Sequence, residues 1–160
     1  MNKMQVAEQT EDQSFPWDNP RFRSWIAVGR ACHLMQTTLS RALQPLDLKT
    51  PHLDILVNLY RFDGLTQQEL ARKLLVGRSN MSMLLPQLEK RGLIERRSDA
   101  SDRRVLRLTL TKPGRSLTEQ AMAVQMKVIE RSMEISTPEE CEMVGDVMSR
   151  MIAALKEDLE

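Results

Sequence analysis

The sequence predicts a mainly α-helical fold that carries one small β-hairpin. Apolar residues recur every three or four positions through most of residues 20–160, which is the spacing of amphipathic helices. Two short segments, 93–97 and 105–110, are strand candidates, and the second alternates between apolar and polar side chains. The chain contains only 6 Gly and 7 Pro, which leaves little room for a loop-rich or all-β fold.

Composition limits the class of protein. A chain of 160 residues can bury one sizeable core but not two, and 41% hydrophobic with 28% charged residues is ordinary for a soluble protein. The two cysteines, Cys32 and Cys141, and the two histidines, His33 and His52, lack the spacing of a disulfide framework or a zinc site. We therefore expect no metal and no cofactor.

Apolar segments of targeting or membrane-spanning length are not found in the sequence. The N-terminus has no signal-peptide stretch, and no segment approaches the roughly 18 apolar residues of a membrane span. We therefore expect a protein of the bacterial cytoplasm without a membrane partner.

Charge is unevenly distributed along the chain. Residues 65–115 contain 12 Lys or Arg and 5 Asp or Glu, a net of +7, whereas the rest contains 11 and 17, a net of −6. A basic region in an otherwise acidic chain fits a surface that binds nucleic acid. The alternative is a solvated charged face without a partner.

The N-terminal part predicts an arm followed by a long helix. Residues 1–14 are polar and predict a mobile tail, and we take the whole arm as 1–19. Four of the six aromatic residues follow within 15–25, which predicts a surface buried against the chain's own end or a second subunit. A helix is predicted from about residue 20 to 46, where Pro45 and a turn end it.

Two shorter helices are expected next. Thr50 is the expected N-cap of the first, with Pro51 at the first helical position and Asp63–Gly64 at the end. Thr66 and Glu69 have the spacing of a capping box and open the second helix. The apolar residues of this second helix are Leu70, Leu74 and Leu75.

Gly77 is predicted to break that helix and to precede another over residues 78–91. Lys90 and Arg91 followed by Gly92 form the expected helix end. The spacing i, i+3, i+4, i+7 defines its buried face. The residues of this face are Met81, Leu84, Leu85 and Leu88.

The C-terminal part predicts two more helices after the hairpin. Pro113–Gly114 opens a helix to about Ser136, and its two apolar stripes predict that it is buried on two sides. Thr137 is the expected N-cap of the last helix, with Pro and acidic residues in the first turn. The apolar residues of that helix are Val144, Val147, Met148, Met151 and Leu155.

This order of elements is that of a winged helix-turn-helix, which places one helix in a DNA major groove and a loop on the adjacent minor groove. The outward side of the 78–91 helix has no acidic residue before Glu89 and is rich in side chains that can hydrogen-bond base edges. We predict DNA contacts from Arg78, Ser79, Asn80, Ser82, Met83 and Gln87. The alternative is an ordinary exposed helix face, and Pro86 predicts a bend beyond the base-reading half.

The loop between the strands carries Asp102, Arg103 and Arg104. One arginine can pair with the carboxylate and stiffen the loop, while the other reaches into a narrow minor groove. Arg96 and Arg97 are predicted phosphate contacts, and Arg107 is either a third or a surface ion pair.

Four segments of this chain resemble the MarR family of bacterial transcriptional regulators. They are Leu65–Ala71, Leu88–Arg96, Asp102–Arg104 and Leu110–Arg115. The resemblance implies a homodimer that binds a pseudo-palindromic DNA operator. It also implies a helical dimerisation region, residues 20–50 and 113–160, and a winged helix-turn-helix DNA-binding lobe, residues 51–112.

The resemblance also implies a small-molecule effector, often aromatic or anionic, that releases the DNA. By position, the first two helices would line its pocket, with Met122 as a further candidate. The residues are His33, Thr37, Leu56, Leu59, Tyr60 and Phe62. The alternative roles are plain core for Leu56 and Tyr60, and a hydrogen-bonded histidine without a ligand for His33.

These features predict a ligand-responsive, DNA-binding transcriptional repressor and not an enzyme. No Ser/His/Asp or Cys/His grouping, Gly-rich phosphate loop or metal spacing occurs in the sequence. One alternative is a thiol-based redox sensor that uses Cys32, although a buried structural cysteine is the better interpretation. Another alternative is a winged-helix module that docks proteins instead of DNA.

Overall fold

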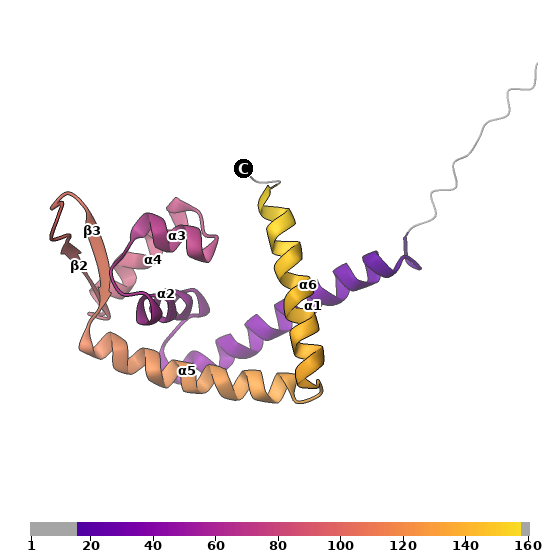
Figure 1. Cartoon of the computed structure of the whole chain (residues 1–160). Coiled ribbons are helices and arrows are strands. Elements are labelled where there is room, and N and C mark those ends of the chain that lie inside the picture. The colour runs from indigo at the N-terminus through magenta and orange to yellow at the C-terminus, as the bar shows by residue number, and fades with distance from the viewer. Residues whose placement is uncertain (1–15, 158–160) are drawn as a thin grey trace, which may run out of the picture. The chain divides into compact units, whose positions relative to one another are not determined.

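The computed structural model describes residues 16–157 (Figure 1). The predicted tail, residues 1–14, and Phe15 of the aromatic cluster lie outside the described residues. The predicted mainly α-helical fold with a small β wing is confirmed. In chain order the elements are α1 (Pro20–Leu43), the 3₁₀ helix η1 (Gln44–Leu46), α2 (Thr50–Arg61), β1 (Leu65–Thr66), α3 (Gln67–Leu74), α4 (Arg78–Lys90), β2 (Ile94–Ser98), β3 (Leu106–Leu110), α5 (Lys112–Met133) and α6 (Pro138–Glu157).

The chain divides into two compact units, Met1–Leu34 and Met35–Glu160. In the first unit, the rings of Trp17 and Phe22 meet edge to face with their centroids 5.4 Å apart. Trp17 and Trp25 nevertheless keep 63% and 60% of their surface exposed. The aromatic cluster is therefore only partly covered.

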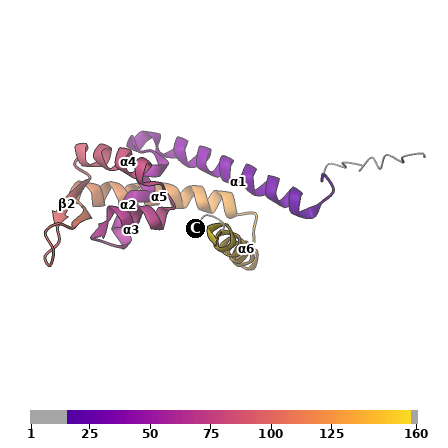
Figure 2. The ribbon, with the colours of Figure 1, turned by 90° about the horizontal axis from the view of Figure 1, so that it is seen from above.

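The second unit contains the winged lobe. Helices α2, α3 and α4 pack against one another, and the β2–β3 hairpin projects from them (Figure 1 and Figure 2). The sheet is antiparallel with the strand order β1-β3-β2, and Arg96 of β2 pairs with Leu108 of β3. Strand β1 was not predicted, because a two-residue strand has no sequence periodicity.

Leucine dominates the core of this unit. Each apolar side chain removed from water stabilises the fold by roughly 1.5–3 kcal/mol. Helix α4 contributes three of the fully buried side chains, so its inner face is held in the core and its opposite face is directed outward. The largest fully buried side chains are Leu43, Leu53, Ile55, Leu56, Leu59, Leu70, Met81, Leu85, Leu88, Leu108 and Thr118.

Two predicted helix boundaries are wrong. Helix α2 begins at Thr50 with Lys49 as the N-cap, so Pro51 takes the second helical position. Proline is tolerated there because the first N–H groups of a helix have no helical partner in any case. Helix α3 ends at Leu74 with Leu75 as its C-cap, whose φ of 54° is left-handed, and Gly77 is instead the N-cap of α4. Leu75 is consequently exposed and not part of the apolar face.

Three other local predictions are confirmed. The Thr66–Glu69 capping box closes in both directions, with the Glu69 N–H donating to Thr66 Oγ1 at 3.2 Å and the Thr66 N–H donating to Glu69 Oε2 at 2.8 Å. Gly92 follows α4 with a φ of 66°. Thr137 caps α6, where its hydroxyl accepts from the N–H of Glu140 at 3.3 Å.

Helix α5 is buried on one side only in this single chain. Its stripe of Leu117, Ala121 and Val124 packs against the core. The second stripe includes Met126 and Ile129, which are 50% and 40% exposed, so the prediction of burial on two sides is wrong for the chain by itself. Most apolar side chains of α6 are also exposed, whereas Met148 and Met151 are half-buried. Within residues 16–157 no helix is both long and apolar enough to cross a membrane.

Candidate nucleic-acid interface

Helix α4 separates a buried face from an exposed polar face. Met81, Leu85 and Leu88 are fully buried, and Leu84 is half-buried. The six predicted DNA-contact residues of this helix are all exposed. They are Arg78, Ser79, Asn80, Ser82, Met83 and Gln87.

The polar side chains of this exposed face differ in how they are held. Ser82 Oγ donates to the carbonyl oxygen of Arg78 at 2.9 Å, and Gln87 Nε2 donates to that of Met83 at 3.0 Å. Within residues 16–157, the side chains of Arg78 and Asn80 make no hydrogen bond or ion pair. These two side chains therefore have their full donor capacity available for a ligand.

Pro86 lies inside α4, which continues through it to Lys90. Proline has no N–H, so the carbonyl of Ser82 cannot accept the usual helical hydrogen bond from position 86. Because Pro86 is exposed and follows the N-terminal half of the helix, the base-reading half keeps its regular backbone donors.

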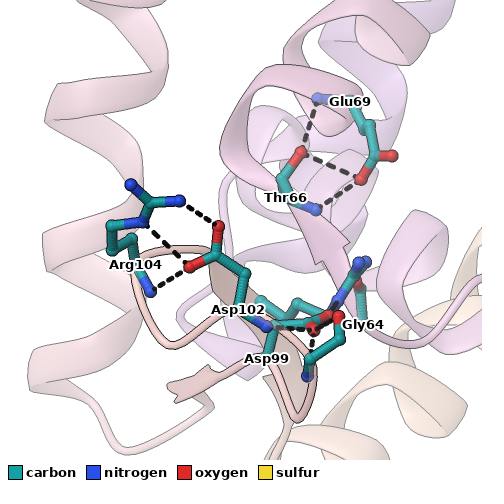
Figure 3. A network of polar contacts seen from close by, with 8 residues as sticks. Gly64, Thr66, Glu69, Asp99, Asp102 and Arg104 are labelled. Carbon is teal, nitrogen blue, oxygen red and sulfur yellow. Dashed lines mark hydrogen bonds and ion pairs between the residues drawn. The ribbon is translucent and has the colours of Figure 1, made fainter.

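Asp99 organises the base of the wing loop (Figure 3). Its carboxylate accepts from the backbone N–H of Ser101 at 2.8 Å and of Asp102 at 3.2 Å, and it forms an ion pair with Arg107. The hydrogen bonds from Ser101 and from Arg107 lower the pKa of Asp99 far below its usual range. The loop is thus built around a carboxylate that stays ionised.

The tip of the loop holds the predicted Asp–Arg pair (Figure 3). Arg104 donates to Asp102 from Nε at 3.1 Å and from Nη2 at 3.0 Å. These hydrogen bonds lower the pKa of Asp102 and raise that of Arg104. Arg103 makes no side-chain hydrogen bond or ion pair within the described part of the chain, and it is exposed. Both arginines are exposed, and within the described residues they differ in that only Arg104 is paired with Asp102.

Arg107 connects the wing to the helical part of the lobe. Its Nη1 donates to the carbonyl oxygen of Gly64 at 2.9 Å, while its Nε is paired with Asp99. Of the two roles predicted for Arg107, a phosphate contact or an ion pair, the structure shows the ion pair. The Gly64 contact was missed, because nothing in the sequence relates positions 64 and 107.

The two arginines of β2 point in different directions. Arg96 turns toward α4, where it pairs with Glu89 and donates to Gln67 of α3. Arg97 pairs with Glu95 of its own strand and keeps 66% of its side chain exposed.

The residues predicted for an effector pocket differ in burial and in their contacts. Leu56 and Leu59 are fully buried in the core. The hydroxyl of Tyr60 donates to Glu119 at 3.0 Å, and the ring of Phe62 lies 3.9 Å from Lys73 Nζ. Thr37 lies on the part of α1 that belongs to the second unit.

Two further residues belong to the first unit. His33 and Cys32 are both exposed on α1. The expectation that Cys32 is a buried structural cysteine is therefore wrong for this chain.

A cavity of about 590 Å³ lies between the end of α1 and α5. None of the six predicted pocket residues lines it. Its walls are Thr38, Ala42, Val124, Lys127, Val128, Arg131 and Ser132.

Comparison with known proteins identifies the lobe. A sequence profile of the MarR family matches residues 46–105, which run from η1 to the end of the wing loop. An HTH-type transcriptional regulator of Bacillus cereus is 30% identical over 102 residues, which cover 64% of this chain and 67% of that relative. The chain belongs to the MarR family of DNA-binding transcriptional regulators.

Solved structures of MarR-family proteins share this fold. AbsC of Streptomyces coelicolor superimposes with a TM-score of 0.80 at 22% identity, over 87% of this chain and 96% of that one. MepR of S. aureus in complex with DNA gives 0.74 at 27% identity, over 81% and 96%. CouR of Rhodococcus jostii bound to p-coumaroyl-CoA gives 0.74 at 25% identity, over 78% and 88%.

Proposed function

We propose that this MarR-family chain binds double-stranded DNA as a homodimer and represses transcription until a small molecule releases it. One observation supports DNA binding most directly. The exposed face of α4 and the exposed Arg103 of the wing both lie in segment 65–115, which has a net charge of +7. MepR, which is 27% identical, has been solved in complex with DNA.

The side chains of α4 suit base readout in a major groove. Arg78 has the fork of donors that matches the O6 and N7 acceptors of guanine, and Asn80 matches adenine. Both lie in the first turn, which a recognition helix presents to base edges. Arg103 would reach the minor groove, where negative potential is strongest, and Arg97 would contact phosphate.

A homodimer is supported by the apolar side chains that this chain leaves exposed. A contiguous exposed apolar face is characteristic of a protein interface. Two recognition helices related by a two-fold axis would read a pseudo-palindromic operator. The exposed apolar residues on α5 and α6 are Met126, Ile129, Met143, Val144, Val147, Ile152 and Leu155.

Release by an effector follows from the same geometry. Both recognition helices must fit one face of DNA, so a ligand that favours a different spacing lowers affinity at both half-sites. CouR binds p-coumaroyl-CoA, an anionic aromatic compound, and the 590 Å³ cavity of this chain carries the cations Lys127 and Arg131. We propose an anionic aromatic effector and action in the cytoplasm, where the DNA is.

Binding to a labelled duplex, enriched by the protein from a random pool, tests this function. We expect Arg78→Ala to relax the base preference at one position of each half-site. Arg103→Ala should weaken binding and lower the slope of log K against log salt by about one. Arg41→Ala near the end of α1 is the control, since it removes the same charge from an exposed position outside the basic segment. Equal effects of all three variants would favour a protein-docking module that binds DNA only through its net charge.

A further inference from the structure

A chain of polar contacts joins the recognition helix to the wing strand. Arg96 of β2 donates to Glu89 of α4 from Nε at 2.7 Å and from Nη2 at 3.4 Å. Its third nitrogen, Nη1, donates to Gln67 Oε1 of α3 at 3.2 Å. Each of the three guanidinium nitrogens is thus already engaged within the protein.

The contacts continue from Gln67 into the base-reading half of α4. Gln67 Nε2 donates to Ser82 Oγ at 3.2 Å, and that hydroxyl donates to the carbonyl oxygen of Arg78 at 2.9 Å. Glu89, Arg96, Gln67 and Ser82 form what we call the α4–β2 bridge. It links both ends of the recognition helix to the first turn of α3 and to the strand that leads into the wing.

Burial distinguishes this bridge from an ordinary surface ion pair. The side chains of Arg96 and Glu89 are only 30% and 29% exposed. The neighbouring pair on β2, Arg97 and Glu95, is 66% and 42% exposed and lies within one strand, so it connects no two elements. A pair that is partly shielded from water and joined in a network is stronger than an isolated exposed pair.

We propose that the α4–β2 bridge sets the position of the recognition helix relative to the wing, and that Arg96 is a positioning residue and not a phosphate contact. This inference rests on the proposed DNA-binding function. The major groove and the adjacent minor groove lie at a fixed spacing, so a helix and a wing that shift against each other cannot occupy both. Loss of the bridge therefore lowers discrimination between specific and non-specific DNA more than it lowers affinity in general.

The two roles of Arg96 predict opposite effects for Glu89→Ala. If Arg96 contacted phosphate, removing the carboxylate would free the guanidinium and delete a negative charge, so that DNA would bind as well or better. The bridge instead predicts a loss of about fivefold in the ratio of affinities for the enriched and a scrambled duplex. Arg96→Ala should cause a similar loss, and the double variant should lose no more than the worse single variant.

The experiment measures dissociation constants on both duplexes at several salt concentrations. Arg97→Ala is the control for Arg96→Ala, because it removes the same charge from the same strand. Gln67→Ala breaks the bridge without a change of charge, and it is the deciding variant if Arg96→Ala is unfolded by circular dichroism. The inference is overturned if Glu89→Ala does not reduce discrimination, or if Arg96→Ala acts like Arg97→Ala, weakening both duplexes equally with a salt slope lower by about one.

A wild-type protein that enriches no duplex would overturn the proposed function separately. Thermal unfolding of the wild type, of Glu89→Ala, of Arg96→Ala and of the double variant then tests the bridge itself. Non-additive losses in Tm for Glu89→Ala and Arg96→Ala would show that the two residues act together, and additive losses would overturn the bridge.

Discussion

At the scale of single residues, Gly114 fixes the junction between the wing and α5. A Cβ atom at this position would lie 1.8 Å from the carbonyl oxygen of Leu93. The Gly114 N–H donates to Thr111 Oγ1 at 3.0 Å, and the Thr118 hydroxyl donates to the Gly114 carbonyl at 2.7 Å. Only glycine allows the first turn of α5 to approach the backbone this closely.

We expect Gly114→Ala to lower the free energy of unfolding by about 3 kcal/mol, because the clash is with backbone and cannot be relieved by a rotamer change. Chemical denaturation measures this loss. Gly145→Ala in α6 is the matched control, since no atom lies within 4 Å of the added methyl. Equal stability of the two variants would show that the junction is looser than described.

His52 is the second residue with a measurable consequence. It is 4% exposed on α2, and neither ring nitrogen completes a hydrogen bond within residues 16–157. Burial, with Lys49 as a smaller cause, lowers the pKa of His52 below its ordinary value of 6.5, although nearby Gln87 and Asp47 act in the opposite direction. Protonation of this ring is therefore less favourable in the folded protein than in the unfolded chain.

Stability should consequently fall as the pH drops below about 6.5, because the unfolded chain takes up a proton that the folded chain resists. Urea unfolding between about pH 5.5 and 7.5 avoids most carboxylate titration. His52→Gln should flatten the pH dependence, whereas His33→Gln on the exposed face of α1 should retain it. A wild-type stability that rises on acidification would contradict a lowered pKa of His52.

At the scale of elements, the recognition helix contains a residue that weakens it. Pro86 removes one backbone hydrogen bond in the interior of α4. We expect Pro86→Ala to raise the free energy of unfolding by about 1–3 kcal/mol, as measured by thermal or urea unfolding. Met83→Ala, at another exposed position of the same helix, should change stability by less than about 0.5 kcal/mol. A destabilised Pro86→Ala variant would mean that the fold requires the local shape that proline imposes.

Local signals in the sequence predicted these elements well. The Thr66–Glu69 capping box and the Gly92 helix end depend on residues a few positions apart, so their spacing is visible in the chain. The predicted end of α3 was wrong, because glycine usually takes the left-handed conformation after a helix and here Leu75 takes it. The backbone of the turn, and not the residue type, determined where α3 ends.

Contacts between distant segments could not be predicted. Arg107 meets Gly64 across 43 positions, and Arg96 meets Gln67 across 29. Arginine is the residue type expected at a DNA contact. Only the fold shows that Arg96 and Arg107 instead bind groups of the protein itself. The exposed face of α4 was predictable, because amphipathic spacing alone separates it from the core.

At the scale of the whole molecule, the exposed apolar side chains of α5 are part of the proposed dimer interface. We expect Ile129→Glu to separate the proposed homodimer into monomers in sedimentation velocity, because a buried unpaired carboxylate opposes association. Circular dichroism should show that the variant stays folded. Glu130→Ala, next to it on the helix, should leave the dimer intact. A wild-type protein that sediments as a monomer would contradict the proposed assembly.

The central claim is that two identical winged lobes read one stretch of DNA. Selection of duplexes from a random pool by the purified protein, at physiological salt, tests it most directly. The account predicts enrichment of a motif with two-fold symmetry, whose half-site centres lie about one helical turn apart. Failure to enrich any motif, with only weak salt-sensitive binding, would contradict sequence-specific recognition, and a single asymmetric half-site would contradict the dimer.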